Sequence, residues 1–119
     1  MIILDSPVKR WPGKIHLPDY LNFRLEAEWE RAIEDIGKEA DGADNSVLSV
    51  SARPAQAMII LPVVLSIVQK WELGGGFPQY PTIDDFPATP KQSSALLLAF
   101  VIGEINKLYE EAQDVPLAS

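Results

Sequence analysis

Few side chains in this sequence could perform covalent chemistry. His16 is the only histidine, and the chain has no cysteine. A histidine that acts as a general base needs an orienting carboxylate and a cleft, and the residues around His16 indicate neither. We therefore interpret His16 as an exposed residue of an extended segment. Without cysteine, a thiolate nucleophile, a thiolate metal site and a disulfide framework are excluded, which favours a reducing compartment.

Two further motifs match known sites only in part. Asp84 and Asp85 are adjacent in a proline-rich loop, whereas calcium loops place their acids at alternate positions, so a solvated loop is the better interpretation. The glycines at 74–76 follow a predicted helix, whereas a phosphate-binding glycine loop follows a strand and begins a helix. They indicate a helix stop. We therefore expect no catalytic residue, no metal, no cofactor and no enzymatic activity.

The remaining candidates are apolar side chains suited to contacts with another protein. Tryptophan is enriched at interface hot spots, although it is equally at home in cores. Trp29 lies on a helical apolar stripe and is expected in the core, whereas Trp11 follows Arg10 and precedes Pro12 and is the tryptophan most expected to be exposed. The candidate protein-interaction residues are Trp11, Trp71, Leu97, Phe100 and Val101.

The charge of the chain is strongly acidic and uneven. The formal net charge is −7; residues 1–18 hold three basic residues and one acid, whereas residues 19–45 hold nine acids and three basic residues. Such a surface repels phosphate backbones, so we expect no nucleic-acid partner. The first ten residues lack the basic segment and apolar run of a secretory signal, which predicts a cytoplasmic location.

The elements that would position these side chains are predicted to be helical. Leu25, Trp29, Ile33 and Ile36 follow helical spacing after a possible N-cap at Asn22, which predicts a helix over 22–40. Proline-initiated apolar segments predict helices over 54–73 and 90–113. Residues 1–21 form an extended arm or a small β-hairpin, and 114–119 form a tail. The expected fold is a mainly α, three-helix bundle-like single domain.

The apolar segments of the second and third helices are larger than a chain of 119 residues needs for one core. Residues 57–68 are apolar nearly all round, but the stretch is shorter than the roughly 20 residues that a bilayer demands, so we expect no membrane span. Pro62 is expected to kink or split this helix. The linker over 74–90 is expected to pack as an ordered strap. We predict that surplus apolar surface makes the isolated protein a homo-oligomer, a dimer or higher, with the second or third helix at the interface.

Short segments along nearly the whole chain resemble the small tail assembly chaperones of long-tailed bacteriophages and prophages. In chain order they are Trp11-Pro12-Gly13-Lys14, Leu17-Pro18-Asp19-Tyr20-Leu21, Trp29-Glu30 with Ala32, Lys70-Trp71-Glu72-Leu73, Phe86-Pro87-Ala88-Thr89-Pro90, and Ile105 through Leu108-Tyr109-Glu110-Glu111-Ala112. The resemblance implies an all-helical protein that binds the aggregation-prone tape measure protein and helps to recruit the tail tube protein.

A second function of a different class is compatible with the same acidity. An acidic inhibitor or immunity-type protein would block the basic active site of a toxin or enzyme through complementary charge. Gene neighbourhood separates the two hypotheses. A very long helical reading frame beside the gene supports the chaperone, whereas an adjacent toxin gene supports the inhibitor.

Overall fold

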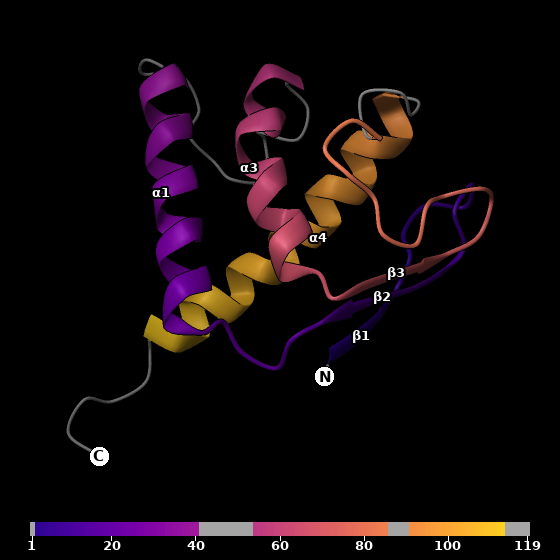
Figure 1. The fold of residues 1–119 in the computed structure, drawn as a ribbon, viewed down its shortest axis with the longest axis horizontal. Helices are drawn as coiled ribbons and strands as arrows, with labels where there is room; N and C mark the ends of the chain where they lie inside the picture. The colour runs from indigo at the N-terminus through magenta and orange to yellow at the C-terminus, as the bar shows by residue number, and fades with distance from the viewer. Residues whose placement is uncertain (1, 41–53, 86–90, 114–119) are drawn as a thin grey trace.

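The N-terminal residues form a β-hairpin that is completed by a strand from the middle of the chain. In the computed structural model, which describes residues 2–40, 54–85 and 91–113, β1 (Ile2–Asp5) pairs with β2 (Gly13–Leu17), and β2 pairs with β3 (Lys70–Leu73) (Figure 1). Both pairings are antiparallel, in the order β1-β2-β3. The hairpin alone would be marginal, so the third strand is what makes a stable sheet.

The sheet has one apolar and one polar face, as the alternation of its residues requires. Ile15 and Leu17 of β2 and Trp71 of β3 point inward and are buried. Lys14 and His16, which alternate with them on β2, lie on the opposite face. The sheet therefore covers one side of the core and presents its polar side outward.

The first helix, α1 (Phe23–Ala40), agrees with the prediction over 22–40. The Asn22 side-chain oxygen accepts a hydrogen bond from the Leu25 backbone N–H at 2.8 Å, which is the N-cap interaction that the sequence indicated. Trp29 and Ile36 are buried, whereas Ile33 is half-buried against the core. Helical periodicity therefore identified both the element and its inner face.

The second helix is shorter than predicted. α3 spans Pro54–Ile67 as one helix through Pro62, and the segment 70–73, predicted as its last turn, is strand β3. Val68 N–H still donates to Val64 C=O at 2.9 Å, but the next amide, of Gln69, donates to His16 C=O at 2.9 Å. The chain thus leaves the helix where the edge of β2 offers a backbone acceptor.

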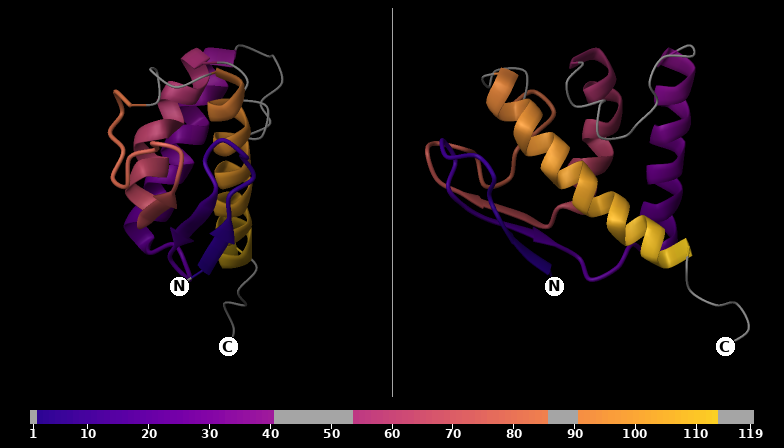
Figure 2. Two further views of the ribbon diagram at one scale, coloured as in Figure 1. Left: turned by 90° about the vertical axis from the view of Figure 1, so that its right-hand side faces the viewer. Right: turned by 180° about the vertical axis from the view of Figure 1, so that it is seen from behind.

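The last helix, α4 (Lys91–Gln113), follows the prediction over 90–113 closely. It runs diagonally across one side of the molecule and ends beside the start of α1 (Figure 2). Ile102 and Ile105 are fully buried along its inner side. The long helix therefore ties the sheet and the α1–α3 pair to one core.

The predicted fold class is wrong. Within the described residues the chain forms three helices and a three-stranded antiparallel sheet, which is a small α+β domain and not a mainly α bundle. Three strands of four or five residues are too short to give a clear alternating pattern in the sequence. β1 and β2 fall within the predicted arm or hairpin, whereas β3 pairs with β2 residues at least 54 positions away, so local sequence could not identify β3.

The strap prediction is correct only at its start. Phe77 is buried, whereas Tyr80 and Ile83 are exposed. Phe86 lies outside the described residues, as do the predicted cap at Thr89 and the tail over 114–119. None of the helices in the described segments combines the length and the apolar character needed to cross a membrane.

Candidate functional site

The candidate residues Trp11 and Trp71 come together in one buried aromatic cluster. Both rings pack against Phe77, with ring centroids 4.9 Å from Trp11 and 5.6 Å from Trp71. Trp11 is only 4% exposed, so the expectation that it is the exposed tryptophan is wrong. The physical reason is the third ring, because Phe77 covers Trp11. Phe77 lies 66 positions further along the chain, so no local sequence pattern could predict the contact.

The three candidates on α4 are also largely inside. Leu97 and Val101 are fully buried, whereas Phe100 is half-buried and packs against the core. The half-exposed side of Phe100 is the part of this set that can reach another molecule. The other four candidates, which are Trp11, Trp71, Leu97 and Val101, expose almost no surface to another molecule.

One accessible surface without charged residues lies on α3. At 100° per residue, Met58, Pro62 and Ser66 fall on the solvent side of the helix, and Ile59, Val63 and Leu65 flank them as half-buried side chains. We call these six residues the α3 face. It contains no charged residue, because α3 itself has none. A helix side without charge that is open to solvent is typical of an interaction surface.

A hollow continues the α3 face at the C-terminal end of the helix. It holds about 430 Å³ and lies between the segment that leads into α1 and the end of α3. Its lining residues are Pro18, Asp19, Tyr20, Asn22, Leu25, Ser66, Ile67 and Gln69. Since Ser66 belongs both to the hollow and to the α3 face, the two features form one continuous surface.

Two aromatic rings stand out at the entrance to α1. Tyr20, which lines the hollow, is 72% exposed, and Phe23, the first residue of α1, is 90% exposed. Neither ring contributes to the core at this exposure. Large aromatic side chains supply contact area at low entropic cost, which is why interfaces use them as anchors.

The side of α1 that faces solvent carries mixed charge with an acidic excess. Glu30, Glu34 and Asp35 are exposed there, against Arg24 and Arg31. Arg24 pairs with Glu28 at 3.3 Å, which leaves the acids dominant. The exposed side of α1 therefore has a negative net charge.

The acidic side of α1 also contacts the end of α4. The Tyr109 hydroxyl donates a hydrogen bond to Glu30 Oε1 at 2.8 Å. This hydrogen bond, together with burial and the negative charges of Glu30 and Glu26, raises the pKa of the Tyr109 hydroxyl above its ordinary value of 10.0. The contact fixes α1 against α4.

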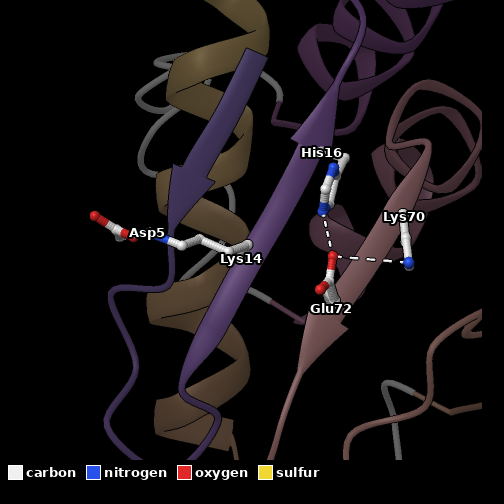
Figure 3. A network of polar contacts seen from close by, with 5 residues as sticks. All are labelled: Asp5, Lys14, His16, Lys70 and Glu72. Atoms are coloured by element: carbon white, nitrogen blue, oxygen red, sulfur yellow. Dashed lines mark hydrogen bonds and ion pairs between the residues drawn. The ribbon is translucent and has the colours of Figure 1, made fainter. Parts of the chain in front are cut away.

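A second polar arrangement covers the outer face of the sheet (Figure 3). His16 Nε2 lies 2.7 Å from Glu72 Oε1, and Lys70 Nζ lies 3.7 Å from the same oxygen. Lys14 forms an ion pair with Asp5 on the neighbouring strand. The hydrogen bond with His16, followed by the positive charge of Lys70, lowers the pKa of the Glu72 carboxyl below its ordinary value of 4.5.

The His16–Glu72 pair supplies the orienting carboxylate that the sequence did not indicate. A general base also needs a substrate cleft and a group to activate. The His16 side chain is 14% exposed and that of Glu72 is 52% exposed, with Lys14 and Lys70 on either side (Figure 3). Neither His16 nor Glu72 lines the hollow at the end of α3. Among the described residues no group of three or more histidine, aspartate or glutamate side chains could hold a metal ion. The arrangement fits a cross-strand polar ladder.

Sequence reasoning missed the α3 face and the aromatic pair at the start of α1. Met58, Pro62 and Ser66 recur every four residues, which is the signal of one helix side, but the surrounding apolar residues concealed it. Phe23 lies six positions before Trp29 and so falls off the apolar stripe of α1, which was the available sign that it is exposed.

Comparison of this chain with protein-family models, with curated proteins and with solved structures gave no match. The resemblance to tail assembly chaperones therefore rests on the sequence segments quoted above.

Proposed function

We propose that this protein works by binding another protein chain, as a tail assembly chaperone that holds the tape measure protein during assembly of a long phage tail. The α3 face is the observation that supports the proposal most directly. Its six uncharged residues are exposed or half-buried, on a helix whose opposite side is fully buried. Surface of this kind gains free energy when an apolar partner covers it.

The shape and charge of the surface favour an amphipathic helix as partner. Helices bind by placing an apolar stripe in a groove, with anchoring side chains at successive turns. The α3 face would accept the stripe, and the hollow beside Tyr20 would accept a larger anchor. The acidic excess on the exposed side of α1 favours a partner helix that carries lysine or arginine.

Tape measure proteins suit this binding mode because, as the resemblance implies, they are long helical chains that aggregate unless another protein covers them. A chaperone of this type works by mass action: it binds the exposed apolar stripe and removes it from aggregation. No covalent step is required. Recruitment of the tail tube protein, which the resemblance also implies, would use surface outside the α3 face.

Co-expression with a tape measure protein tests the proposal, and the candidate is any very long helical protein that is found to be encoded beside the gene. The expected result is that the tape measure protein becomes soluble and is purified together with this chain. A double variant, Met58→Asp on the α3 face with Tyr20→Asp in the hollow, should weaken the complex at least about tenfold, since each anchoring contact contributes roughly 1 kcal/mol or more.

Leu96→Asp provides the matched control, because Leu96 is an exposed apolar helix residue outside the α3 face and the hollow. It should bind as the natural chain does. Equal binding by the double variant would remove the α3 face from the proposal. If the neighbouring gene encodes a toxin and this chain neutralises it, the inhibitor hypothesis replaces the chaperone hypothesis.

A further inference from the structure

The free edge of β1 provides a second and separate interaction surface. β1 is the outermost strand of the sheet in Figure 1, and no described helix or strand lies beyond it. Ile3, at its centre, is 56% exposed. An edge strand with free backbone groups is a template for pairing with another strand, unless the protein covers it.

The hydrogen-bond pattern identifies which backbone groups point outward. Ser6 N–H donates to Gly13 C=O at 3.0 Å, so Ser6 and Gly13 form a hydrogen-bonded pair. Bonded and non-bonded pairs alternate along an antiparallel ladder. Leu4 is therefore bonded to Ile15, whereas the N–H and C=O groups of Ile3 and Asp5 point away from β2.

The hydrogen bonds on the β3 side of β2 confirm this alternation. The C=O group of His16, the residue opposite Ile3, accepts from Gln69 N–H on the β3 side, and Pro12 C=O accepts from Gly74 N–H in the same direction. Even-numbered residues of β2 thus bond toward β3, and odd-numbered residues bond toward β1. No backbone hydrogen bond in the described part of the chain reaches the outer edge of β1.

We propose that β1 pairs antiparallel with β1 of a second copy of this chain, centred on Leu4, to form a continuous six-stranded sheet. In this register Ile3 of each copy lies opposite Asp5 of the other. The four outward backbone groups of each strand then exchange hydrogen bonds with those of its partner. Leu4 faces Leu4 of the second copy in a non-bonded pair, where side chains approach most closely.

Burial on the inner face of the sheet favours the same occupant. Ile15 and Leu17, on the central strand, are fully buried, whereas Ile2 and Leu4, which point to the same face on β1, remain half-buried. The difference arises because no described segment lies beside β1 to cover them. A second β1 would place Leu4 against Leu4 and Ile2 beside Ser6.

Charge opposes contact between two copies less at this end of the molecule than elsewhere. Two chains of net charge −7 repel each other over most of their surfaces. Residues 1–18 carry three basic residues against one acid, so two copies of this segment, each with a charge of only +2, repel each other more weakly. Asp5, the single acid, already pairs with Lys14 on the neighbouring strand. The two copies therefore approach where their repulsion is least.

The contact is small, which determines the type of dimer to expect. Two paired strands of four residues cover far less than the roughly 1,200 Å² of standard stable interfaces. The dimer therefore belongs to the weak, concentration-dependent class. Sedimentation equilibrium across a hundredfold concentration range should show reversible monomer–dimer exchange. A monomer throughout that range would overturn the proposal.

Cysteine cross-linking tests the register, and the absence of natural cysteines makes the experiment clean. Leu4→Cys places two thiols in the closest cross-strand pair and should form a disulfide-linked dimer under mild oxidation. Ile3→Cys is the control: Ile3 is more exposed than Leu4 but lies opposite Asp5 of the second copy. Random collision favours cross-linking at residue 3, whereas the proposed register favours residue 4. Faster linkage of Ile3→Cys would overturn the proposal.

Ile3→Pro tests the backbone hydrogen bonds without relying on a side chain. Proline removes the outward N–H of Ile3 and leaves the ladder with β2 intact, because proline is tolerated on the open side of an edge strand. Circular dichroism should remain unchanged, and the association constant should fall about tenfold or more. A variant that dimerises as well as the natural chain would place the interface elsewhere, with the α3 face as the next candidate.

Discussion

The two edges of the sheet have the same backbone chemistry but different surroundings. On β3, the outward N–H of Trp71 donates to Gln79 C=O at 3.4 Å, so the chain folds back over its own edge. Phe77, within this returning segment, lies between Trp11 and Trp71. On β1 no described segment returns, and Ile3 stays exposed. One edge is thus closed by local chain geometry, whereas the other is available to a partner.

The two edges should therefore differ in what they contribute to the stability of the monomer and to association. Side chains at the closed edge are buried and should dominate the free energy of unfolding. Exposed side chains at the open edge, such as Ile3, contribute little to the stability of the monomer and are free for association. Substitutions at the two edges should therefore separate the two properties.

Phe77→Ala should have the largest effect, because it removes the ring that both tryptophans contact. Truncation of a buried phenylalanine costs about 3 kcal/mol or more. Chemical denaturation should show this loss, and the near-ultraviolet circular dichroism of Trp11 and Trp71 should weaken. Tyr80→Ala is the control on the same segment, since Tyr80 is exposed and its loss should change stability by less than about 0.5 kcal/mol. Equal effects would contradict the closed-edge description.

Gly75→Ala should be the next most damaging change. Gly75 has φ of +71°, and a Cβ atom there would clash with the Arg10 carbonyl oxygen. Strain and clash together should lower the free energy of unfolding by about 2 kcal/mol. Gly76→Ala separates the two causes, because Gly76 has φ of +86° but open space around its Cβ position. It should cost about 1 kcal/mol from backbone strain alone.

Glu72→Gln should have a smaller effect, and that effect should depend on pH. Because folding lowers the pKa of Glu72, the carboxylate stabilises the folded state above the ordinary pKa of 4.5, and this contribution is lost as pH falls through the lowered value. The stability difference between the natural chain and Glu72→Gln should therefore shrink with acidification below about 4.5. Denaturation curves at a series of pH values measure it. A difference that grows in acid would reverse the assigned sign.

Ile3→Lys should have the smallest effect on the monomer. The side chain is exposed on the open edge, so the free energy of unfolding should change by less than about 0.5 kcal/mol. The free energy of unfolding should be measured on dilute protein, in which the monomer prevails. A loss as large as that of Phe77→Ala would mean that the β1 edge supports the fold and is not free for a partner.

Only part of the site could be predicted from the sequence. The reason why a prediction failed differs from one residue to another. The alternation of polar and apolar residues did not identify the β3 segment, because Trp71 and Glu72 sit within four residues that also continue a helical apolar pattern. The α3 face followed a four-residue spacing, but whether that side is covered depends on where α1 and α4 pack. Trp11 is buried because of Phe77, a contact between segments that only the folded chain brings together.

The sequence alone determined α1, α4 and the inner face of α1. Helical hydrogen bonds join residues four apart, so the stripe of Trp29 and the cap at Asn22 contain the information that these elements need. The tertiary structure alone decided that residues 70–73 form a strand, that Trp11 is inside, and that β1 keeps an open edge. Strand hydrogen bonds join residues distant in the chain, so Lys70–Leu73 becomes a strand only where β2 lies beside it.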